Sequence, residues 1–203
     1  MSFEVGPMRN DERRAVAAMY GDAFVDDPGW IDVGPGGRER RRRYARRICG
    51  GEVWAARRAG GEVLVARDGC VPTAACVYYP PEAIPLSLVI TFAEVPGAAL
   101  AGPRVVVRSL RADARLQAGH PDEPHVFVSL LAAHPDRQRG GRGRALLNAA
   151  IAEATRLEVP AYLDTANPAN VPYYRSFGFL ETGQTPLPRG APLWYLLRPL
   201  SSG

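Results

Sequence analysis

One segment of the chain combines residue types and spacing that could bind a phosphate-bearing ligand, the glycine-rich run QRGGRGR at residues 138–144. Glycines allow successive backbone amides to converge on one point, and a helix that follows adds unpaired N–H groups and the positive end of its dipole. Arginine side chains in the run could add charge-assisted contacts to phosphate oxygens. We therefore predict a pyrophosphate site, whose residues are Gln138, Arg139, Gly140, Gly141, Arg142, Gly143 and Arg144.

Other interpretations of this run are weaker. It has no Lys followed by Ser or Thr, which a P-loop needs, and no G-x-G-x-x-G, which a dinucleotide-binding fold needs. RNA-binding RGG segments are repeated and disordered, whereas this single copy lies between a predicted strand and a predicted helix. A plain glycine-rich turn is the remaining alternative.

A second run could carry acid chemistry. Residues 167–179 read NPANVPYYRSFGF, and Tyr174 lies four residues before the pair Gly178 and Phe179. Taken without other information, Tyr174 is more easily explained as a packing aromatic next to Tyr173 and Phe177.

Together the two runs resemble a known family. The pattern Q-x-x-G-x-G after a strand ending in Ala133, His134 and Pro135 resembles the acetyl-CoA-binding motif of the GNAT superfamily of N-acetyltransferases. The tyrosine before the Gly-Phe pair, about thirty residues later, resembles the second GNAT signature. Residues 124–179, the chain length and the tail at residues 188–190 are similar to puromycin N-acetyltransferase-like proteins. One departure is that the family usually has Gly where Arg139 stands and a basic residue where Gly140 stands.

The resemblance implies a site. In GNAT folds the central strand splays from its parallel neighbour, and pantetheine lies in the gap against backbone groups, here those of Leu131, Ala132 and Ala133. A bulge in this strand would point a backbone N–H at the thioester carbonyl. Tyr174 matches the general acid that protonates the departing thiolate, since a phenol pKa of about 10 is close to a thiol pKa of about 8.5. Asn167 matches a CoA-contacting position.

Other roles in this site stay open. Asn170 either holds the pantetheine amides or caps the short helix. Glu123 is the carboxylate we predict as catalytic base, with His125 as the alternative, although each is also typical of a solvated loop. Asp26 and Asp27 either face the substrate amine or end the first helix, and deprotonation through water needs no dedicated residue.

The arginine-rich run at residues 38–47 could bind an acidic partner or nucleic acid. Dense like charges avoid a core, so we favour a solvated helix face with Tyr44 and Ile48 turned inward.

The elements that must position these residues follow from hydrophobic periodicity. Residues 126–133 (VFVSLLAA) are almost continuously apolar, as in a strand covered on both faces, and the helix after the glycine run leads to another strand at 161–164. Asn10 or Asp11 could cap the first helix. Residues 80–120 are the hardest to interpret. We predict further strands at 3–8, 62–67, 73–79, 179–182 and 193–198, and helices at 14–24, 38–58, 92–100, 105–116, 144–156 and 167–177.

Composition agrees with one domain spanning residues 1–203 and a mixed α/β (α+β) class. The chain has 203 residues, 46% of them hydrophobic, and a formal charge of +4 in which every basic residue is Arg. The three cysteines lack metal-binding spacing, and no run reaches the roughly 18 apolar residues of a spanning helix. We expect a cytoplasmic protein with no metal, no membrane contact and no nucleic-acid partner, as a monomer or homodimer.

These observations imply a GNAT fold, with a mostly antiparallel central sheet, flanking helices and a splayed parallel strand pair. The implied activity is transfer of acetyl from acetyl-CoA to a primary amine of a small molecule, such as an aminonucleoside or natural product, for antibiotic resistance or tailoring. Alternatives are acetylation of a protein or peptide and a non-catalytic CoA-binding regulatory module. A longer acyl donor is also compatible with the sequence.

Overall fold

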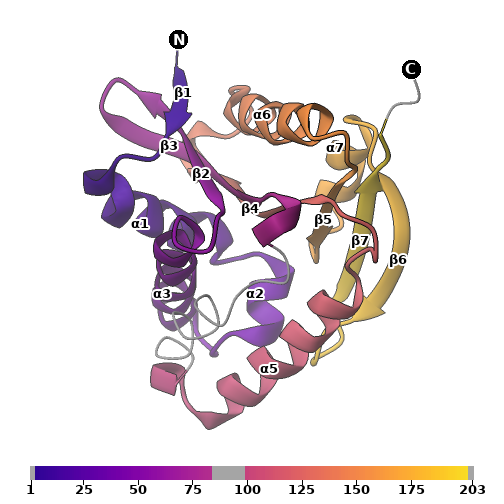
Figure 1. Cartoon of the computed structure of the whole chain (residues 1–203). Helices are drawn as coiled ribbons and strands as arrows, with labels where there is room; N and C mark the ends of the chain where they lie inside the picture. The colour runs from indigo at the N-terminus through magenta and orange to yellow at the C-terminus, as the bar shows by residue number, and fades with distance from the viewer. Residues whose placement is uncertain (1–2, 84–98, 201–203) are drawn as a thin grey trace.

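The structure, a computed structural model, describes residues 3–83 and 99–200 as a seven-stranded sheet with helices on both faces (Figure 1). The strand order is β1-β2-β3-β4-β5-β7-β6, and only β4 and β5 are parallel. This confirms the predicted mixed α/β class and the mostly antiparallel sheet. The strands are β1 (Glu4–Pro7), β2 (Glu62–Asp68), β3 (Val71–Tyr79), β4 (Val126–Ala133), β5 (Ala161–Thr165), β6 (Leu180–Pro186) and β7 (Pro192–Arg198).

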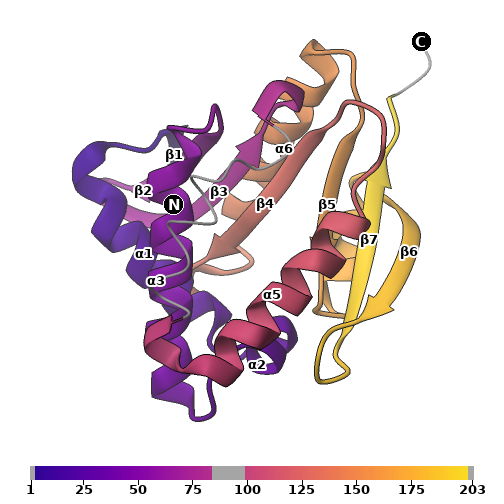
Figure 2. The same cartoon turned by 60° about the horizontal axis from the view of Figure 1, so that its bottom comes forward.

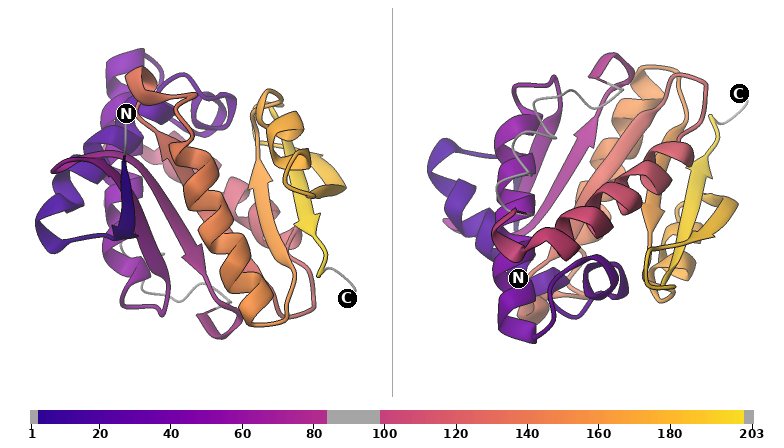
Figure 3. Two further views of the ribbon diagram at one scale, coloured as in Figure 1. Left: turned by 90° about the horizontal axis from the view of Figure 1, so that it is seen from above. Right: turned by 90° about the horizontal axis from the view of Figure 1, so that it is seen from below.

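Helices divide between the two faces of the sheet, as the opposed views of Figure 3 show. One face carries α1 (Arg13–Phe24), α2 (Pro28–Val33), α3 (Arg38–Ala56) and α5 (Pro103–Ala118). The other face carries α6 (Arg142–Arg156) and α7 (Asn170–Arg175). The 3-10 turns are η1 (Asn10–Glu12), η2 (Pro81–Ala83) and η3 (Pro135–Arg137).

The core has two halves, one on each side of β4. Phe127 and Leu130 pack toward α1 and α3, while Val126 and Val128 pack toward α6. Phe127 and Leu130 are three residues apart, although residues on one face of a regular strand are two apart. The alternation therefore slips by one residue inside β4.

Most predicted elements are present, but α2 was not predicted. The Asp27 carboxylate accepts hydrogen bonds from the backbone N–H groups of Gly29 (2.9 Å) and Trp30 (3.4 Å). Asp27 thus caps the start of α2, and its backbone N–H donates to the Phe24 oxygen at the end of α1. Most of the helix predicted at 92–100 lies outside the described residues.

The predicted cap of α1 was wrong. Neither Asn10 nor Asp11 caps this helix; Glu12 instead accepts the backbone N–H of Arg9 at 2.7 Å. The reason is tertiary, because the same carboxylate is held by the buried guanidinium of Arg67 on β2, with an Nη2–Oε2 distance of 2.8 Å.

Candidate active site

The parallel pair at the centre of the sheet separates after a short contact. β4 and β5 pair only through Val126↔Ala161, Phe127↔Tyr162 and Val128↔Leu163, and Figure 2 shows the two strands diverging. Among the residues that the structure describes, none pairs with residues 129–133 of β4 on the β5 side. Their outward backbone groups on that side are available to a ligand that lies along the strand.

A bulge lies at the start of this splay. Tyr78 of β3 pairs with Val128, whereas Val77 pairs with Leu130, so Ser129 is the extra residue of β4. A bulge leaves one residue unpaired and re-aims the neighbouring groups. The slip in the core alternation and the bulge are thus one feature, placed where the parallel pairing ends.

Ser129 is hydrogen-bonded to a carboxylate that the sequence analysis missed. Its hydroxyl donates to Glu52 Oε1 at 2.5 Å, and Glu52, on α3, is only 6% exposed. Burial raises the pKa of Glu52 to about 7, against the opposing effect of hydrogen bonds from Ser129 and Tyr79. A signal was present, since Glu52 lies in register with the apolar face of α3.

A second carboxylate, Asp164, lies on the opposite side of the splay. It follows Leu163, the last β5 residue paired with β4, just as Ser129 follows Val128. Burial, and next the charge of Glu52, raise the pKa of Asp164 to about 7. Residue type and spacing indicated Asp164 only as the end of a strand.

Aromatic rings pack next to the splay, on the part of β4 and β5 where the two strands are still paired. The ring centroid of Tyr162 lies 4.8 Å from that of His120 and 5.8 Å from that of Phe127. The Tyr162 hydroxyl and His120 Nε2 are buried and make no hydrogen bond within the described part of the chain. These are unsatisfied polar atoms next to the opening.

Neither base candidate from the sequence lies in the splay. The Glu123 side chain is exposed, six residues before Ser129. His125 is buried, with its Nδ1 2.7 Å from the Glu123 carbonyl oxygen and its Nε2 3.0 Å from His120 Nδ1. Burial lowers the pKa of both imidazoles, that of His120 to about 4.

The glycine-rich loop leads into α6 as the sequence predicted. Gly141, with φ of +80°, is the N-cap residue, and Arg139 adopts a left-handed φ of +61°. Gln138 and Arg139 are exposed and make no hydrogen bond within the ranges described. The exposed Arg144 guanidinium lies 5.0 Å from the centroid of the Phe177 ring.

Arg142 has a different environment from the one the sequence suggested. Its side chain is 5% exposed, and its Nη2 lies 2.6 Å from Asp68 Oδ1 and 2.7 Å from Oδ2. Its Nε also donates to the Thr73 hydroxyl at 3.1 Å. The guanidinium therefore ties the start of α6 to the β2–β3 hairpin. Only the backbone groups of Arg142 are left to contribute to the glycine-rich loop.

Tyr174 lies on α7 against the α6 half of the core and is 7% exposed. Its ring contacts Tyr173 and Phe179, with centroids 5.4 and 6.1 Å away. Burial raises the pKa of Tyr174 above its usual value, and the charges of Asp164 and Asp27 add to this. The phenol therefore stays protonated over a wider pH range than a free tyrosine.

The two asparagines make local contacts. Asn167 Oδ1 accepts the backbone N–H of Ala169 at 3.0 Å, and its side chain also bonds Asp27. Asn170 Nδ2 lies 3.4 Å from the Thr165 hydroxyl. Both asparagines thus order the connection between β5 and α7.

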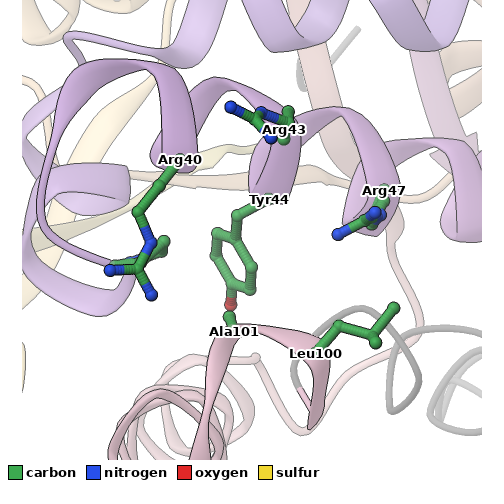
Figure 4. A pocket seen from close by; sticks show the side chains of 7 residues that line it. Arg40, Arg43, Tyr44, Arg47, Leu100 and Ala101 are labelled. Carbon is green, nitrogen blue, oxygen red and sulfur yellow. The ribbon is translucent and has the colours of Figure 1, made fainter.

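The arginine-rich run forms an outer face of α3, away from the splay. Tyr44 and Ile48 are buried, as expected, and Arg38 pairs with Asp26 at 2.9 Å. Figure 4 shows Tyr44 pointing toward Ala101 between the arginines. The hollow there is lined by Pro35, Arg40, Arg43, Tyr44, Arg47, Leu100 and Ala101.

Residues 3–83 and 99–200 contain no group of three or more side chains arranged to hold a metal ion. Within the same ranges, no helix is both long and apolar enough to cross a membrane.

Known proteins match part of this sequence and share this fold. Residues 87–179 match the Acetyltransferase (GNAT) family. A Corynebacterium glutamicum structure described as histone acetyltransferase HPA2 and related acetyltransferase is 22% identical, with a TM-score of 0.73 over 100% of this chain and 99% of its own. YncA from Salmonella typhimurium, solved with its cofactor acetyl-CoA, is 18% identical, with a TM-score of 0.61 over 100% and 96%.

A third solved structure, the ribosomal-protein-S18-alanine N-acetyltransferase from Escherichia coli, is 15% identical, with a TM-score of 0.56 over 100% and 96% of the two chains. At these identities the likeness to solved structures shows the fold, and the family match shows the kind of enzyme over the residues that it covers. Residues 87–179 match the GNAT acetyltransferases, and the chain has the fold of these acyltransferases, which use acetyl-CoA.

Proposed function

We propose that this enzyme transfers the acetyl group of acetyl-CoA to a primary amine of a small molecule by direct attack. The observation that carries the proposal is the splay of β4 from β5, which begins at the Ser129 bulge and ends near the glycine-rich loop. One continuous path thus offers backbone groups for pantetheine and a helix N-terminus for the pyrophosphate.

Each part of the donor has residues suited to it. The pyrophosphate would meet the backbone amides of Gly141, Arg142 and Gly143, with the exposed side chains of Gln138 and Arg139 beside them. The pantetheine would lie along residues 131–133. A backbone N–H re-aimed by the bulge would stabilise the oxyanion of the tetrahedral intermediate. The YncA structure with acetyl-CoA supports this donor.

Tyr174 is the proposed general acid. Its buried phenol keeps its proton at neutral pH, so it can donate a hydrogen bond to the sulfur as the C–S bond breaks. CoA then leaves as a neutral thiol instead of as a thiolate anion.

The position of α5 favours a small acceptor, because this helix is held across the face of the sheet on which the acceptor would bind. Arg108 of α5 donates to the backbone oxygens of Val33 (2.9 Å) and Gly34 (2.7 Å), and the Tyr195 hydroxyl donates to the Arg115 oxygen at 2.7 Å. These bonds fix α5 across the face on which Glu52 and Asp164 lie. The resemblance to puromycin N-acetyltransferase-like proteins points the same way, to a natural-product or antibiotic amine.

The first experiment measures CoA release from acetyl-CoA with a panel of aminonucleosides, aminoglycosides, polyamines and peptides. Turnover on a small amine with none on peptides supports the proposal. Turnover confined to peptides would replace it with protein acetylation, and tight acetyl-CoA binding without any turnover would argue against catalysis of either kind.

Substitution of the proposed acid tests the mechanism. We expect Tyr174→Phe to lower kcat by about 100-fold or more, the usual contribution of a general acid, with the Kd for acetyl-CoA changed little. Tyr78→Phe is the matched control, because Tyr78 is equally buried in the same half of the core. Equal losses of kcat in both variants would show that Tyr174 only packs.

A further inference from the structure

We propose that Ser129 and Asp164, with Glu52 behind Ser129, form the site that binds the acceptor as a protonated primary amine and takes its protons. This inference rests on the proposed function and adds to it the charge state of the substrate and the identity of the base.

The site is defined by the register of the parallel strands. Ser129 and Asp164 are the first residues beyond the last β4–β5 pair, so they lie on the two strands at the point where the sheet opens. Ser129 contacts Glu52 of α3, and Asp164 is two residues from Tyr162, which packs in the same half of the core as α3. Both polar groups therefore lie on the α3–α5 side of the sheet.

The carboxylates lack a protein cation. Within the residues the structure describes, no arginine or histidine forms an ion pair with Glu52 or Asp164. The groups that face Glu52 are Tyr20 from α1, Tyr79 from β3, Ser129 from β4 and Asp164 from β5. The charge of Asp164 also raises the pKa of Tyr162, Tyr174 and Tyr195. Glu52 is buried and Asp164 is half-buried, and two such acids without a counter-charge favour a cationic ligand.

A separate observation also points to a ligand here. The Tyr162 side chain is fully buried and its hydroxyl has no hydrogen-bond partner in the described ranges. The charge of Asp164 acts on this hydroxyl, which places the two groups near one another. An ammonium bound to Asp164 would place N–H donors next to the Tyr162 hydroxyl, which could then accept a hydrogen bond.

The proton count of the reaction matches the two carboxylates. Asp164 takes one proton from the ammonium, and the freed lone pair forms the N–C bond with the thioester carbon. As the C–S bond breaks, sulfur takes the Tyr174 proton, and nitrogen gives its second proton to Ser129 Oγ, which passes its own to Glu52. Both carboxyl groups then release their protons to water and Tyr174 regains one, so each turnover yields amide, CoA and one proton.

The kinetic test compares Glu52→Gln, Ser129→Ala and Asp164→Asn with the wild type, using an amine that the wild type acetylates. We expect Glu52→Gln and Asp164→Asn each to lower kcat about 100-fold or more and to make the rise of kcat/KM across neutral pH less steep, because one of the two proton acceptors is lost. Ser129→Ala should lose activity that Ser129→Thr, which keeps the hydroxyl, retains. Asp122→Asn is the control, since Asp122 is exposed and makes no hydrogen bond or ion pair within the described ranges.

A binding test does not depend on turnover. Calorimetry with phenethylamine and its neutral analogue 2-phenylethanol, on the complex with CoA, which carries no acetyl group to transfer, should show tighter binding of the amine by the wild type. Asp164→Asn should reduce that preference at least tenfold. Equal binding of the two probes by the wild type overturns the inference.

The outcomes separate the inference from the function beneath it. If the wild type neither binds acetyl-CoA nor releases CoA, the proposed function fails. If the wild type turns over but folded Glu52→Gln keeps its rate and pH profile, or if Glu123→Gln alone loses them, the inference fails and the function stands.

Discussion

Burial of Glu52 has a consequence for stability as well as for chemistry. Its pKa rises from 4.5 to about 7, so the folded protein holds a proton that the unfolded chain releases between those values. The stabilisation is fully present below the unfolded pKa and is lost as pH rises through the folded pKa. A shift of this size corresponds to about 3 kcal/mol.

We therefore expect the free energy of unfolding of Glu52→Gln to increase relative to the wild type between pH 5 and pH 8, by up to about 3 kcal/mol. Urea unfolding of both proteins at several pH values measures this difference. Parallel pH curves would mean that Glu52 keeps an ordinary pKa in the folded protein.

At the scale of elements, the glycine-rich loop depends on the contact between Arg142 and Asp68. Gly140 has no side chain that could obstruct this contact, and a Cβ at position 140 would lie 2.3 Å from Arg142 Nη1. Gly140 must therefore stay small while Arg142 is buried.

We expect Gly140→Ala to displace the Arg142 guanidinium from Asp68, lower the Tm by several degrees and weaken acetyl-CoA binding about tenfold. The reason is that the displaced guanidinium leaves Asp68 without its bidentate partner and loosens the N-terminus of α6. Gly36→Ala is the matched control, because nothing lies within 4 Å of a Cβ there and its φ is not positive. Thermal unfolding and calorimetry measure the two effects, and unchanged values would show that Arg142 moves without cost.

At the scale of the whole molecule, one buried ion pair joins the N-terminal turn to the sheet. Arg67 Nη2 donates to the Pro7 oxygen at 2.6 Å and to Glu12 Oε2 at 2.8 Å, and both side chains are almost fully buried. The hydrogen bond from Arg67 holds the pKa of Glu12 below its usual value. The resulting stability is present above the unfolded pKa and is lost as pH falls through the folded one.

Removing one partner of a buried pair leaves an uncompensated charge, so we expect Glu12→Gln to lower the free energy of unfolding by about 3 kcal/mol at pH 7. Asp26→Asn removes the exposed pair with Arg38 and should cost less than about 1 kcal/mol. Urea unfolding compares the two. The difference between them should shrink below pH 4, and a difference that persists there would rule out the ionised Glu12 as its cause.

The sequence by itself determined the strand–loop–helix unit at residues 126–156 and the hairpin at 62–79. These features depend on local periodicity and turn chemistry, which neighbouring residues set. The same holds for the inward position of Tyr44 and Ile48. The family resemblance also identified the splayed pair before its register was known.

Tertiary structure alone decided which charged groups serve the site. Arg142 is buried against Asp68, some seventy residues away in sequence, whereas Arg139 stays exposed. Glu52 acquires its environment by packing against Ser129, 77 residues further along the chain. Asp164 acquires its environment from the point where two strands stop pairing. Desolvation and charge pairing depend on neighbours distant in the chain, so residue type and spacing could not assign these roles.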